Sequence, residues 1–402
     1  MAHRPSVLTG LDVFRTGAGR PWRKARLGLI VHAASATAGL EPAADALARA
    51  GFTVQALFAP EHGMEGALQD QTPVGPSRHP RLGLPVHSLY GDPTRAREFA
   101  RLSPSDQALE KLDALVFDLQ DIGVRYYTFV WTMALAMAAC ARRGKPFLVL
   151  DRPNPLGGDV MEGNLPDPDF LSFVGLHPVP ARHGLTAGEL ALWLNETSAA
   201  EPRADLTVIP MKGWRRRMWG DQTGLPWIMP SPNMPTLDTA AVYAGMCLVE
   251  GTNISEGRGT TRPFELIGAP WLDGPALAET LNDVRIPGAF FRACAFRPAF
   301  HKWSGHVCRG VQVHVTDRDR FPSFLAGLEL IAAVRRLRPG KFSWASPPYE
   351  YESRKLPFDL LSGDDEIRRG LERGVSPSRL ESSWREDRRR FRARTRPFHL
   401  YE

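Results

Sequence analysis

The chain has 402 residues, of which 43% are hydrophobic and 23% charged, and its formal net charge is +6. This length suffices for two or three domains with a large buried core, and the moderate charge excludes a disordered polyelectrolyte. The four cysteines form no C-x-x-C pair, so the sequence predicts neither a disulfide scaffold nor a cysteine metal site.

The first half of the chain alternates short apolar runs with helical patterns, which is typical of βαβ units around a parallel sheet. Near-continuous apolar runs such as ALVFDL favour strands that helices cover on both faces. We therefore expect an α/β fold with a Rossmann-like, doubly wound parallel sheet. The expected strands cover residues 27–32, 53–58, 85–89, 114–119, 147–150 and 206–209. The expected helices cover residues 42–50, 105–111, 127–143 and 186–196, the last opened by a capping box of Thr186 and Glu189.

Near residue 230 the sequence pattern changes to long runs of turn-forming residues. We expect a Rossmann-like N-terminal domain over residues 1–229 and a smaller C-terminal α+β domain over residues 230–402 that closes a cleft. The second domain should contain a strand at 310–315 and a helix at 321–337. The Arg-rich stretch Trp384–Arg396 favours a solvated helix over a nucleic-acid arm, because aromatic residues recur in it and the net charge is modest.

Neither a membrane span nor an export signal is predicted. The longest apolar run, Phe129–Cys140, is too short to cross a bilayer and is flanked by arginines. The first thirty residues contain no apolar stretch of the kind found in signal peptides. The expected location is cytoplasmic for the sequence as written, and periplasmic or secreted if the N-terminus is truncated.

Polar side chains follow three of the expected strands at the point where each strand ends. Because ligands of open parallel sheets bind outside the carboxyl ends of the strands, we expect these side chains to face one pocket. Each motif taken alone is equally compatible with a structural role. Asp121 could cap the next helix, and Arg125 could pair with a neighbouring carboxylate. The residues are Glu61 and His62, then Asp121, Arg125 and Tyr127, then Arg152 and Asn154.

Two loops of the second domain add candidates. The SPNMP loop contains Asn233, and the Gly-rich stretch Glu250–Thr261 contains Glu256 and Arg258. Consecutive backbone N–H groups in such turns can bind an anion, and an arginine can grip a carboxylate with two hydrogen bonds. The alternative is a rigid structural loop that closes on the first domain.

Several chemistries lack their motifs. No G-x-G-x-x-G follows the first strand and no Walker loop is present, so no nucleotide cofactor is expected. A G-x-S-x-G elbow and an S-x-x-K motif are missing too, and His62 has no partner at metal-ligand spacing. Carboxylates, amides, tyrosines and arginines remain, which are the groups that cleave glycosidic bonds and hold sugar hydroxyls.

The sequence resembles the NamZ-like exo-β-N-acetylmuramidase family, formerly a domain of unknown function, over nearly its whole length. The resemblance implies hydrolysis of the non-reducing terminal N-acetylmuramic acid (MurNAc) from peptidoglycan fragments, without metal or cofactor. Implied partners are muropeptides or MurNAc-containing disaccharides. One departure is His32-Ala33-Ala34-Ser35, where the family often has Asn-x-Thr-Gly. The motifs are FAPEHG (58–63), SLYG (88–91), FDLQDIGVRYYTF (117–129), VLDRPNPLGG (149–158), SFVG (172–175), HGLTAGELA (183–191), PSPNMPT (230–236) and EGTNISEGRGTTRPFELIGAPW (250–271).

The resemblance places the family's proposed catalytic glutamate at Glu61, which we expect to be the general acid. Its partner stays open between Asp121, Glu256 and the acetamido carbonyl of the substrate. Two other functions also stay open: a metal-assisted hydrolase using Glu61, His62 and Asp121, and a non-catalytic protein that binds muropeptides or sugar acids. The residues expected to bind substrate are His62, Arg125, Tyr127, Arg152, Asn154, Asn233 and Arg258, with an arginine on the lactyl carboxylate.

Overall fold

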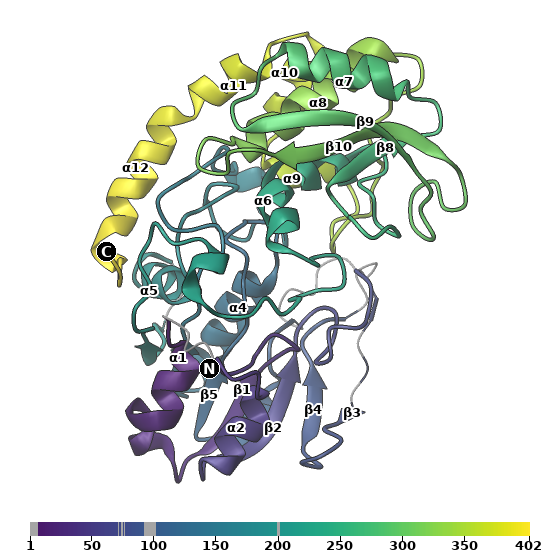
Figure 1. The fold of residues 1–402 in the computed structure, drawn as a ribbon. Coiled ribbons are helices and arrows are strands. Elements are labelled where there is room, and N and C mark those ends of the chain that lie inside the picture. Colours follow the sequence, from purple (N-terminus) through teal and green to yellow (C-terminus); the bar gives the residue numbers. More distant parts are fainter. Residues whose placement is uncertain (1–6, 71, 74, 76, 92–101, 199–201) are drawn as a thin grey trace.

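The computed structural model describes residues 7–70, 72, 73, 75, 77–91, 102–198 and 202–402. It contains a large, mostly parallel sheet and a smaller antiparallel one, one built from each half of the chain (Figure 1). The α/β fold class is therefore confirmed.

The large sheet has seven strands in the order β3-β4-β2-β1-β5-β6-β7. All pairs are parallel except β3 with β4. The chain adds strands outward from β1 on one side and then returns to add β5, β6 and β7 on the other, which makes the sheet doubly wound. The bounds are β1 Arg26–Ile30, β2 Thr53–Ala59, β3 Ser77–Arg78, β4 Pro85–Ser88, β5 Ala114–Phe117, β6 Phe147–Leu150 and β7 Leu206–Ile209.

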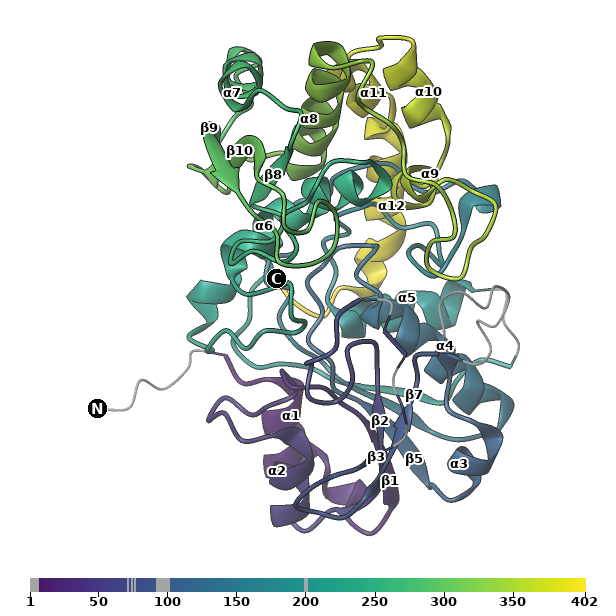
Figure 2. The ribbon, with the colours of Figure 1, turned by 90° about the vertical axis from the view of Figure 1, so that its right-hand side faces the viewer.

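Helices cover both faces of this sheet, as Figure 2 shows from its edge. On one face α1 and α2 pack Leu11 and Leu47 against strand residues such as Leu29 in one buried cluster. On the other face Trp131 of α4 joins Phe117 in the main core, and the central strands are buried throughout. The bounds are α1 Gly10–Val13, α2 Ala43–Arg49, α3 Asp106–Glu110, α4 Phe129–Arg142 and α5 Ala187–Thr197.

The predicted capping box at the start of α5 is confirmed. Thr186 Oγ1 accepts a hydrogen bond from Glu189 N at 3.2 Å, and Glu189 Oε2 accepts one from Thr186 N at 3.1 Å. The Thr186 hydroxyl also donates to Asp151 Oδ2 at 2.7 Å, which ties the helix start to the end of β6. The Asp-Arg-Pro-Asn loop after β6 is therefore held by the next helix.

The second half contains more regular structure than its turn-rich sequence indicates. The smaller sheet has the order β8-β10-β9 and is antiparallel. The predicted strand and helix correspond to β10 and α8, whereas the sequence analysis did not predict α6, α7, β8 or β9. The bounds are α6 Leu237–Met246, β8 Leu266–Ala269, α7 Gly274–Asp283, β9 Ala289–Phe296, β10 Cys308–Val315, α8 Ser323–Leu337, α9 Pro357–Ser362, α10 Glu366–Glu372, α11 Pro377–Ser383 and α12 Arg385–Thr395.

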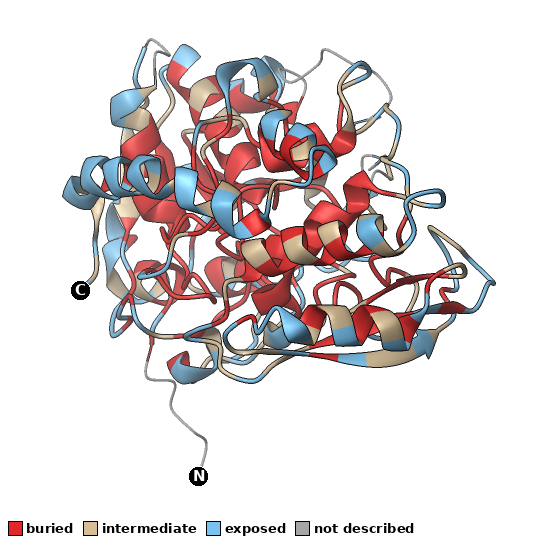
Figure 3. Ribbon diagram, turned by 90° about the horizontal axis from the view of Figure 1, so that it is seen from above, coloured by how far each residue is buried: buried red, intermediate tan, exposed pale blue. Residues whose placement is uncertain are grey.

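The C-terminal helix α12 returns to the first half of the chain, where the C-terminus lies near α5 (Figure 1). Phe391 packs on Trp193 of α5 with ring centroids 5.3 Å apart. Tyr401 then donates a hydrogen bond from its hydroxyl to Asp151 Oδ2 at 2.6 Å. The predicted helix at Trp384–Arg396 is confirmed, and most of its surface is exposed (Figure 3).

One buried cluster runs through both halves, from Phe58 of β2 to Phe391 of α12. The division at residue 230 stays a prediction. In the part of the chain that the structure describes, no helix combines the length and the apolar character that a membrane span needs.

Candidate active site

Glu61 lies in the turn that follows β2, at the carboxyl end of the large sheet. His62 and Gly63 have φ angles of 69° and 77°, so the chain reverses sharply here. The Glu61 side chain is buried, and its Oε2 accepts a hydrogen bond from Thr128 Oγ1 at 2.8 Å. Thr128 is the N-cap residue of α4, so the positive end of that helix lies beside the Glu61 carboxyl group.

A small cavity of about 40 Å³ has Glu61 in its wall. Both halves of the chain line this cavity, which therefore lies between the parallel sheet and the second half. Carboxyl groups dominate its polar wall. The polar side chains include Glu61, His62, Asp70 and Tyr127 from the first half, and Asn233, Glu250, Arg258 and Glu350 from the second.

The loop after His62 is fastened across this cavity. His62 Nδ1 lies 2.8 Å from Leu68 O, so the imidazole holds the loop in place. Further along, Asn233 Nδ2 donates to Gln69 Oε1 at 2.8 Å, which joins the loop to the second half of the chain.

Arg258 is the arginine of the sequence prediction that lines the cavity with Glu61. Its Nη2 donates to Glu250 Oε1 at 2.7 Å, and its Nη1 lies 3.2 Å from Asp70 Oδ1. The guanidinium also stacks over the Phe264 ring, 5.0 Å from the centroid. Two carboxylates of the protein thus occupy the positions that a ligand carboxylate would take on this arginine.

Glu350 is a buried carboxyl group in the same wall, and its Oε2 accepts a hydrogen bond from the Tyr90 hydroxyl at 3.2 Å. Burial is the largest cause that raises the pKa of Glu350 well above its usual value, and the neighbouring Glu61 carboxylate is the next. Asp70 and Glu250 act in the same direction. Burial and the neighbouring carboxyl groups thus favour the protonated form of Glu350.

Tyr127 places a phenol in the wall of the cavity. Its side chain is buried, and its hydroxyl has no hydrogen-bond partner of normal geometry within the described residues, although Ser231 lies beside it. A buried hydroxyl without a partner is costly, so this group is available to a bound polar ligand.

Glu256 lies behind Arg258 and is not part of the cavity wall. Its Oε1 is 3.7 Å from Arg258 Nε and 3.1 Å from His301 Nδ1, and its Oε2 accepts from Lys302 Nζ at 2.9 Å. Burial opposes ionisation, but Lys302 and His301 outweigh it and lower the pKa of Glu256 below its usual value. Glu256 is an ionised support of the Arg258 loop.

The structure does not bring Asp121 and Asn154 to the cavity that holds Glu61, and this corrects the expectation of one shared pocket. Asp121 Oδ2 accepts from Gly123 N at 2.6 Å, and His183 Nε2 lies 3.7 Å from it. Asn154 donates to Leu185 O and accepts from Leu156 N, both at 3.0 Å. Gly123 has a φ of 78°, and a Cβ atom there would collide with the Asn154 amide. These side chains support turns.

Arg125 is also away from the cavity, because its guanidinium is fully buried among main-chain carbonyls. Nη1 donates to Asn164 O at 2.7 Å and Val179 O at 2.9 Å, and Nη2 donates to Leu361 O and Ser362 O at 3.0 Å. Burial lowers its pKa to about 10, so it stays charged at neutral pH. Arg125 joins loops of the two halves and is not placed to bind the lactyl group.

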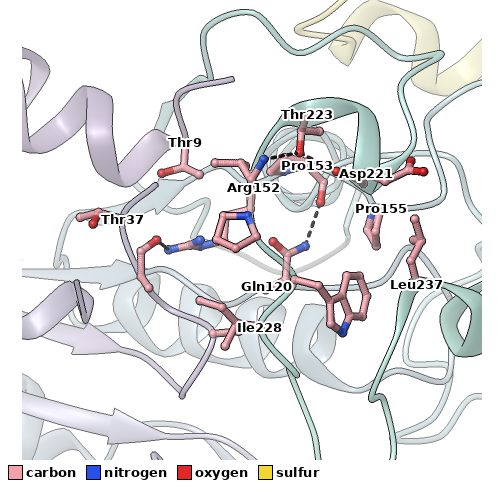
Figure 4. Close-up of a pocket in the computed structure, with 16 residues that line it drawn as sticks. Thr9, Thr37, Gln120, Arg152, Pro153, Pro155, Asp221, Thr223, Ile228 and Leu237 are labelled. Atoms are coloured by element: carbon pink, nitrogen blue, oxygen red, sulfur yellow. Dashed lines mark hydrogen bonds between the residues drawn. The ribbon is translucent and has the colours of Figure 1, made fainter. Parts of the chain in front are cut away.

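Arg152 lines a different pocket, of about 310 Å³, at the ends of β1, β5 and β6 (Figure 4). Its Nε and Nη2 donate to the two carboxylate oxygens of Asp118 at 2.7 and 2.8 Å, and Nη2 also donates to Ala36 O. Burial raises the pKa of Asp118 to about 6, while Arg152 acts in the opposite direction. Asp118 therefore occupies the paired N–H donors of Arg152 that were expected to bind a substrate carboxylate.

The metal-assisted alternative required Glu61, His62 and Asp121 at one point. Glu61 and His62 line the cavity, whereas Asp121 does not. Among the residues that the structure describes, no group of three or more His, Cys, Asp or Glu side chains is arranged to hold a metal ion. The side chains present do not fit that alternative.

Sequence reasoning missed Glu350, together with the roles of Asp70 and Glu250. The available signal was the string Pro347-Pro348-Tyr349-Glu350-Tyr351, which puts a glutamate between two aromatic residues. In the structure Glu350 and Tyr351 have φ angles of 43° and 66°. Such angles are uncommon for residues with side chains and cluster at functional sites.

Fold and site together define a class: a two-part α/β protein with a carboxyl-lined cavity between the parts. Residues 27–238 match the family model described as "Exo-beta-N-acetylmuramidase NamZ, N-terminal". Residues 241–401 match the model described as "Exo-beta-N-acetylmuramidase NamZ, C-terminal". The chain belongs to the NamZ exo-β-N-acetylmuramidase family.

Similar proteins support this assignment over the full length. The chain is 42% identical over 401 residues to the "Peptidoglycan beta-N-acetylmuramidase NamZ" of Bacillus subtilis (strain 168), covering 100% of this chain and 92% of that protein. A crystal structure of a DUF1343 family protein from Bacteroides fragilis NCTC 9343 superposes with a TM-score of 0.88 at 32% identity, covering 100% of both chains. A second one from the same organism has a TM-score of 0.75 at 29% identity, covering 98% of this chain and 99% of that one.

Proposed function

We propose that the protein is a glycoside hydrolase that releases the non-reducing terminal MurNAc residue from peptidoglycan fragments. The full-length similarity to the Bacillus subtilis enzyme carries this proposal. The substrates would be MurNAc-containing disaccharides and larger muropeptides, such as those produced when cell-wall material is recycled. The cavity between the two halves is the proposed site of the reaction.

Glu61 is a catalytic carboxyl group in this proposal, with general acid as the role that the sequence predicts. Its burial in the cavity wall supports a position against the substrate. Of the three candidates for its partner, Asp121 and Glu256 lie outside the wall, which favours the acetamido carbonyl of the substrate.

Different residues of the cavity wall would bind different groups of the substrate. Arg258 would bind the lactyl carboxylate, because a planar guanidinium matches a carboxylate with two hydrogen bonds. The open hydroxyl of Tyr127 and the amide of Asn233 would bind sugar hydroxyls and the acetamido group. His62 would keep the loop of Gln69 and Asp70 in place.

A Glu61→Gln variant tests the proposal. Loss of a catalytic carboxyl should lower kcat by about 100- to 10,000-fold, with little change in binding, because glutamine keeps the shape and loses the proton and charge. Release of MurNAc from the disaccharide MurNAc–GlcNAc, whose leaving group needs a proton, by the purified protein is the measurement.

Glu65 provides a matched control, since it is exposed in the same loop. Glu65→Gln should leave turnover unchanged. Near-wild-type turnover in Glu61→Gln would remove Glu61 from catalysis. Binding of muramide without any turnover by the wild-type protein would reject the hydrolase itself.

A further inference from the structure

Two carboxyl groups of the cavity wall come from opposite halves of the chain. Glu61 follows β2 of the parallel sheet, and Glu350 lies in the loop between α8 and α9. The Tyr90 hydroxyl donates to Glu350 Oε2 at 3.2 Å, and after burial the carboxyl groups of Glu61 and Glu350 are the next causes that raise the pKa of this phenol. The two carboxyl groups are thus neighbours across the cavity.

We propose that Glu350 is a catalytic residue that donates its proton to the glycosidic oxygen, with Glu61 as the ionised carboxylate beside it. This assignment rests on the proposed exo-β-N-acetylmuramidase activity and revises one part of it. Glu350 takes the role of general acid that the sequence predicts for Glu61.

Glu350 is buried among other carboxyl and phenol groups. Its side chain is 5% exposed, which disfavours the charged form. Two like charges in one buried site cannot both ionise easily, so one group of such a pair keeps its proton. The titratable and charged groups around Glu350 are Glu61, Asp70, Tyr90, Glu250, Tyr349 and Tyr351, with Arg258 in the same wall.

Glu61 has a hydrogen-bond donor and a helix end beside its carboxyl group. Thr128 Oγ1 donates a hydrogen bond to the carboxylate, and the N-terminus of α4 lies next to it. A helix of 14 residues has a partial positive charge at this end, which stabilises an anion. In the proposed pair Glu61 is therefore the carboxylate with hydrogen-bond and helix-end partners, and Glu350 is the proton donor.

The cavity wall also contains a hydroxyl group that can bind a ligand. The buried Tyr127 hydroxyl lacks a hydrogen bond of normal geometry to any described residue. It lines the same cavity as both carboxyl groups, so a sugar that bonds to it would enter the cavity that they line. This observation is independent of the carboxyl pair.

The proton balance of the reaction follows. Glu350 transfers its proton to the glycosidic oxygen while the bond from that oxygen to the anomeric carbon breaks, so the leaving sugar departs as a neutral alcohol. The Glu61 carboxylate stabilises the positive charge that develops on the ring. Water then adds to the anomeric carbon, and its proton returns to Glu350.

The leaving group of the substrate provides the test. A p-nitrophenolate leaves as a stable anion and needs no proton, whereas the sugar leaving group of MurNAc–GlcNAc does need one. Glu350→Gln should therefore lower kcat/KM on the disaccharide by about 100-fold or more, and on the p-nitrophenyl muramide by less than about 10-fold. Glu61→Gln should lower both.

Every outcome decides the proposal. An equal loss on both substrates, or none, overturns it, and so does a selective loss in Glu61→Gln instead. Glu352→Gln is the matched control, since Glu352 is half-buried in the same loop and not part of the wall, and it should match the wild type. A wild-type protein that cleaves neither substrate would reject the proposed function itself. An active wild type with an unselective Glu350→Gln rejects the Glu350 role alone.

A Tyr90→Phe variant provides a second test of the proposal, in which Glu350 itself is unchanged. The Tyr90 hydrogen bond lowers the pKa of Glu350, so its removal should raise that pKa. The alkaline limb of the kcat/KM profile, which reports ionisation of the acid, should then move to higher pH. An unmoved limb in an active Tyr90→Phe variant contradicts the assignment.

Discussion

At the scale of single residues, the proposed contact between Arg258 and the lactyl group predicts a substrate preference. Arg258 already contacts Glu250 and Asp70, so a bound lactyl group has to compete with carboxylates of the protein. Only a substrate with its own carboxylate can replace those contacts on equal terms. This arrangement disfavours neutral sugars.

Arg258→Lys should therefore reduce discrimination between substrates. Lysine keeps the charge but lacks the planar fork, so kcat/KM on a β-muramide should fall by about 10- to 100-fold. The rate on the matching β-N-acetylglucosaminide should change little, because that sugar has no carboxylate. The ratio of the two rates is the measurement.

Arg262→Lys is the control for this variant, since Arg262 pairs with Glu265 in the same loop at 3.0 Å and is exposed. It should leave the ratio unchanged. If Arg258→Lys slows both sugars by one factor, Arg258 does not bind the lactyl group.

The sequence motifs predicted several residues of the cavity wall. They also contain polar side chains whose hydrogen bonds go to main-chain groups instead of the cavity. His62, Tyr127 and Asn233 lie in the wall, and they come from short motifs at strand or loop ends. Arg125 satisfies carbonyls that lie far away in sequence, such as Leu361 O. Which buried carbonyl needs a donor depends on the tertiary fold, and a local motif does not contain that information.

At the scale of elements, the parallel sheet was predictable because each strand is a continuous apolar run. β6 and β7 have the predicted bounds, and the other predicted strands differ by one or two residues at their ends. The strands β8 and β9 were missed, since β8 has only four residues and β9 shows no regular alternation of buried and exposed residues. Periodicity is weak in such short segments.

The contact between α6 and α8 depends on glycine. A Cβ atom on Gly327 of α8 would collide with the backbone of Gly245 in α6. Alanine normally stabilises a helix relative to glycine by about 1 kcal/mol, but overpacking here should outweigh that gain. We expect Gly327→Ala to lower the free energy of unfolding by about 1–3 kcal/mol in denaturant titrations.

Gly340→Ala tests whether the effect comes from the crossing. Gly340 has no atoms within 4 Å of its added Cβ. The free energy of unfolding of this variant should stay within about 0.5 kcal/mol of the wild type. A Gly327→Ala variant as stable as the wild type would show that the two helices can separate without cost.

At the scale of the whole molecule, the C-terminal segment joins the two halves. Tyr401 donates to Asp151 at the end of β6 and accepts from Met211 N at 3.0 Å. Arg216 N donates to Glu402 O at 2.8 Å. Residues 401 and 402 thereby hold the segments that follow β6 and β7.

Tyr401→Phe should destabilise the protein more at alkaline than at acidic pH. Burial raises the pKa of Asp151 from 3.8 to about 6, so this group reduces stability as the pH rises through that range. The Tyr401 hydrogen bond acts in the opposite direction, because it favours the ionised form. Its loss should cost about 1.5–3 kcal/mol near pH 8 and less near pH 5, measured by chemical unfolding.

Glu402→Gln is the control, since the structure uses the backbone oxygen of Glu402 and leaves its side chain exposed. It should be neutral at both pH values. A Tyr401→Phe variant with the same loss of stability at both would mean that Asp151 does not titrate in this range.

The position of Tyr401 has a consequence for biosynthesis. A ribosome delivers the strands of the parallel sheet first, and N-terminal domains commonly fold before translation ends. Asp151, by contrast, accepts its hydrogen bond from a residue 250 positions downstream. The strands of the parallel sheet are therefore all synthesised well before the residue that donates to Asp151, and this contact forms late.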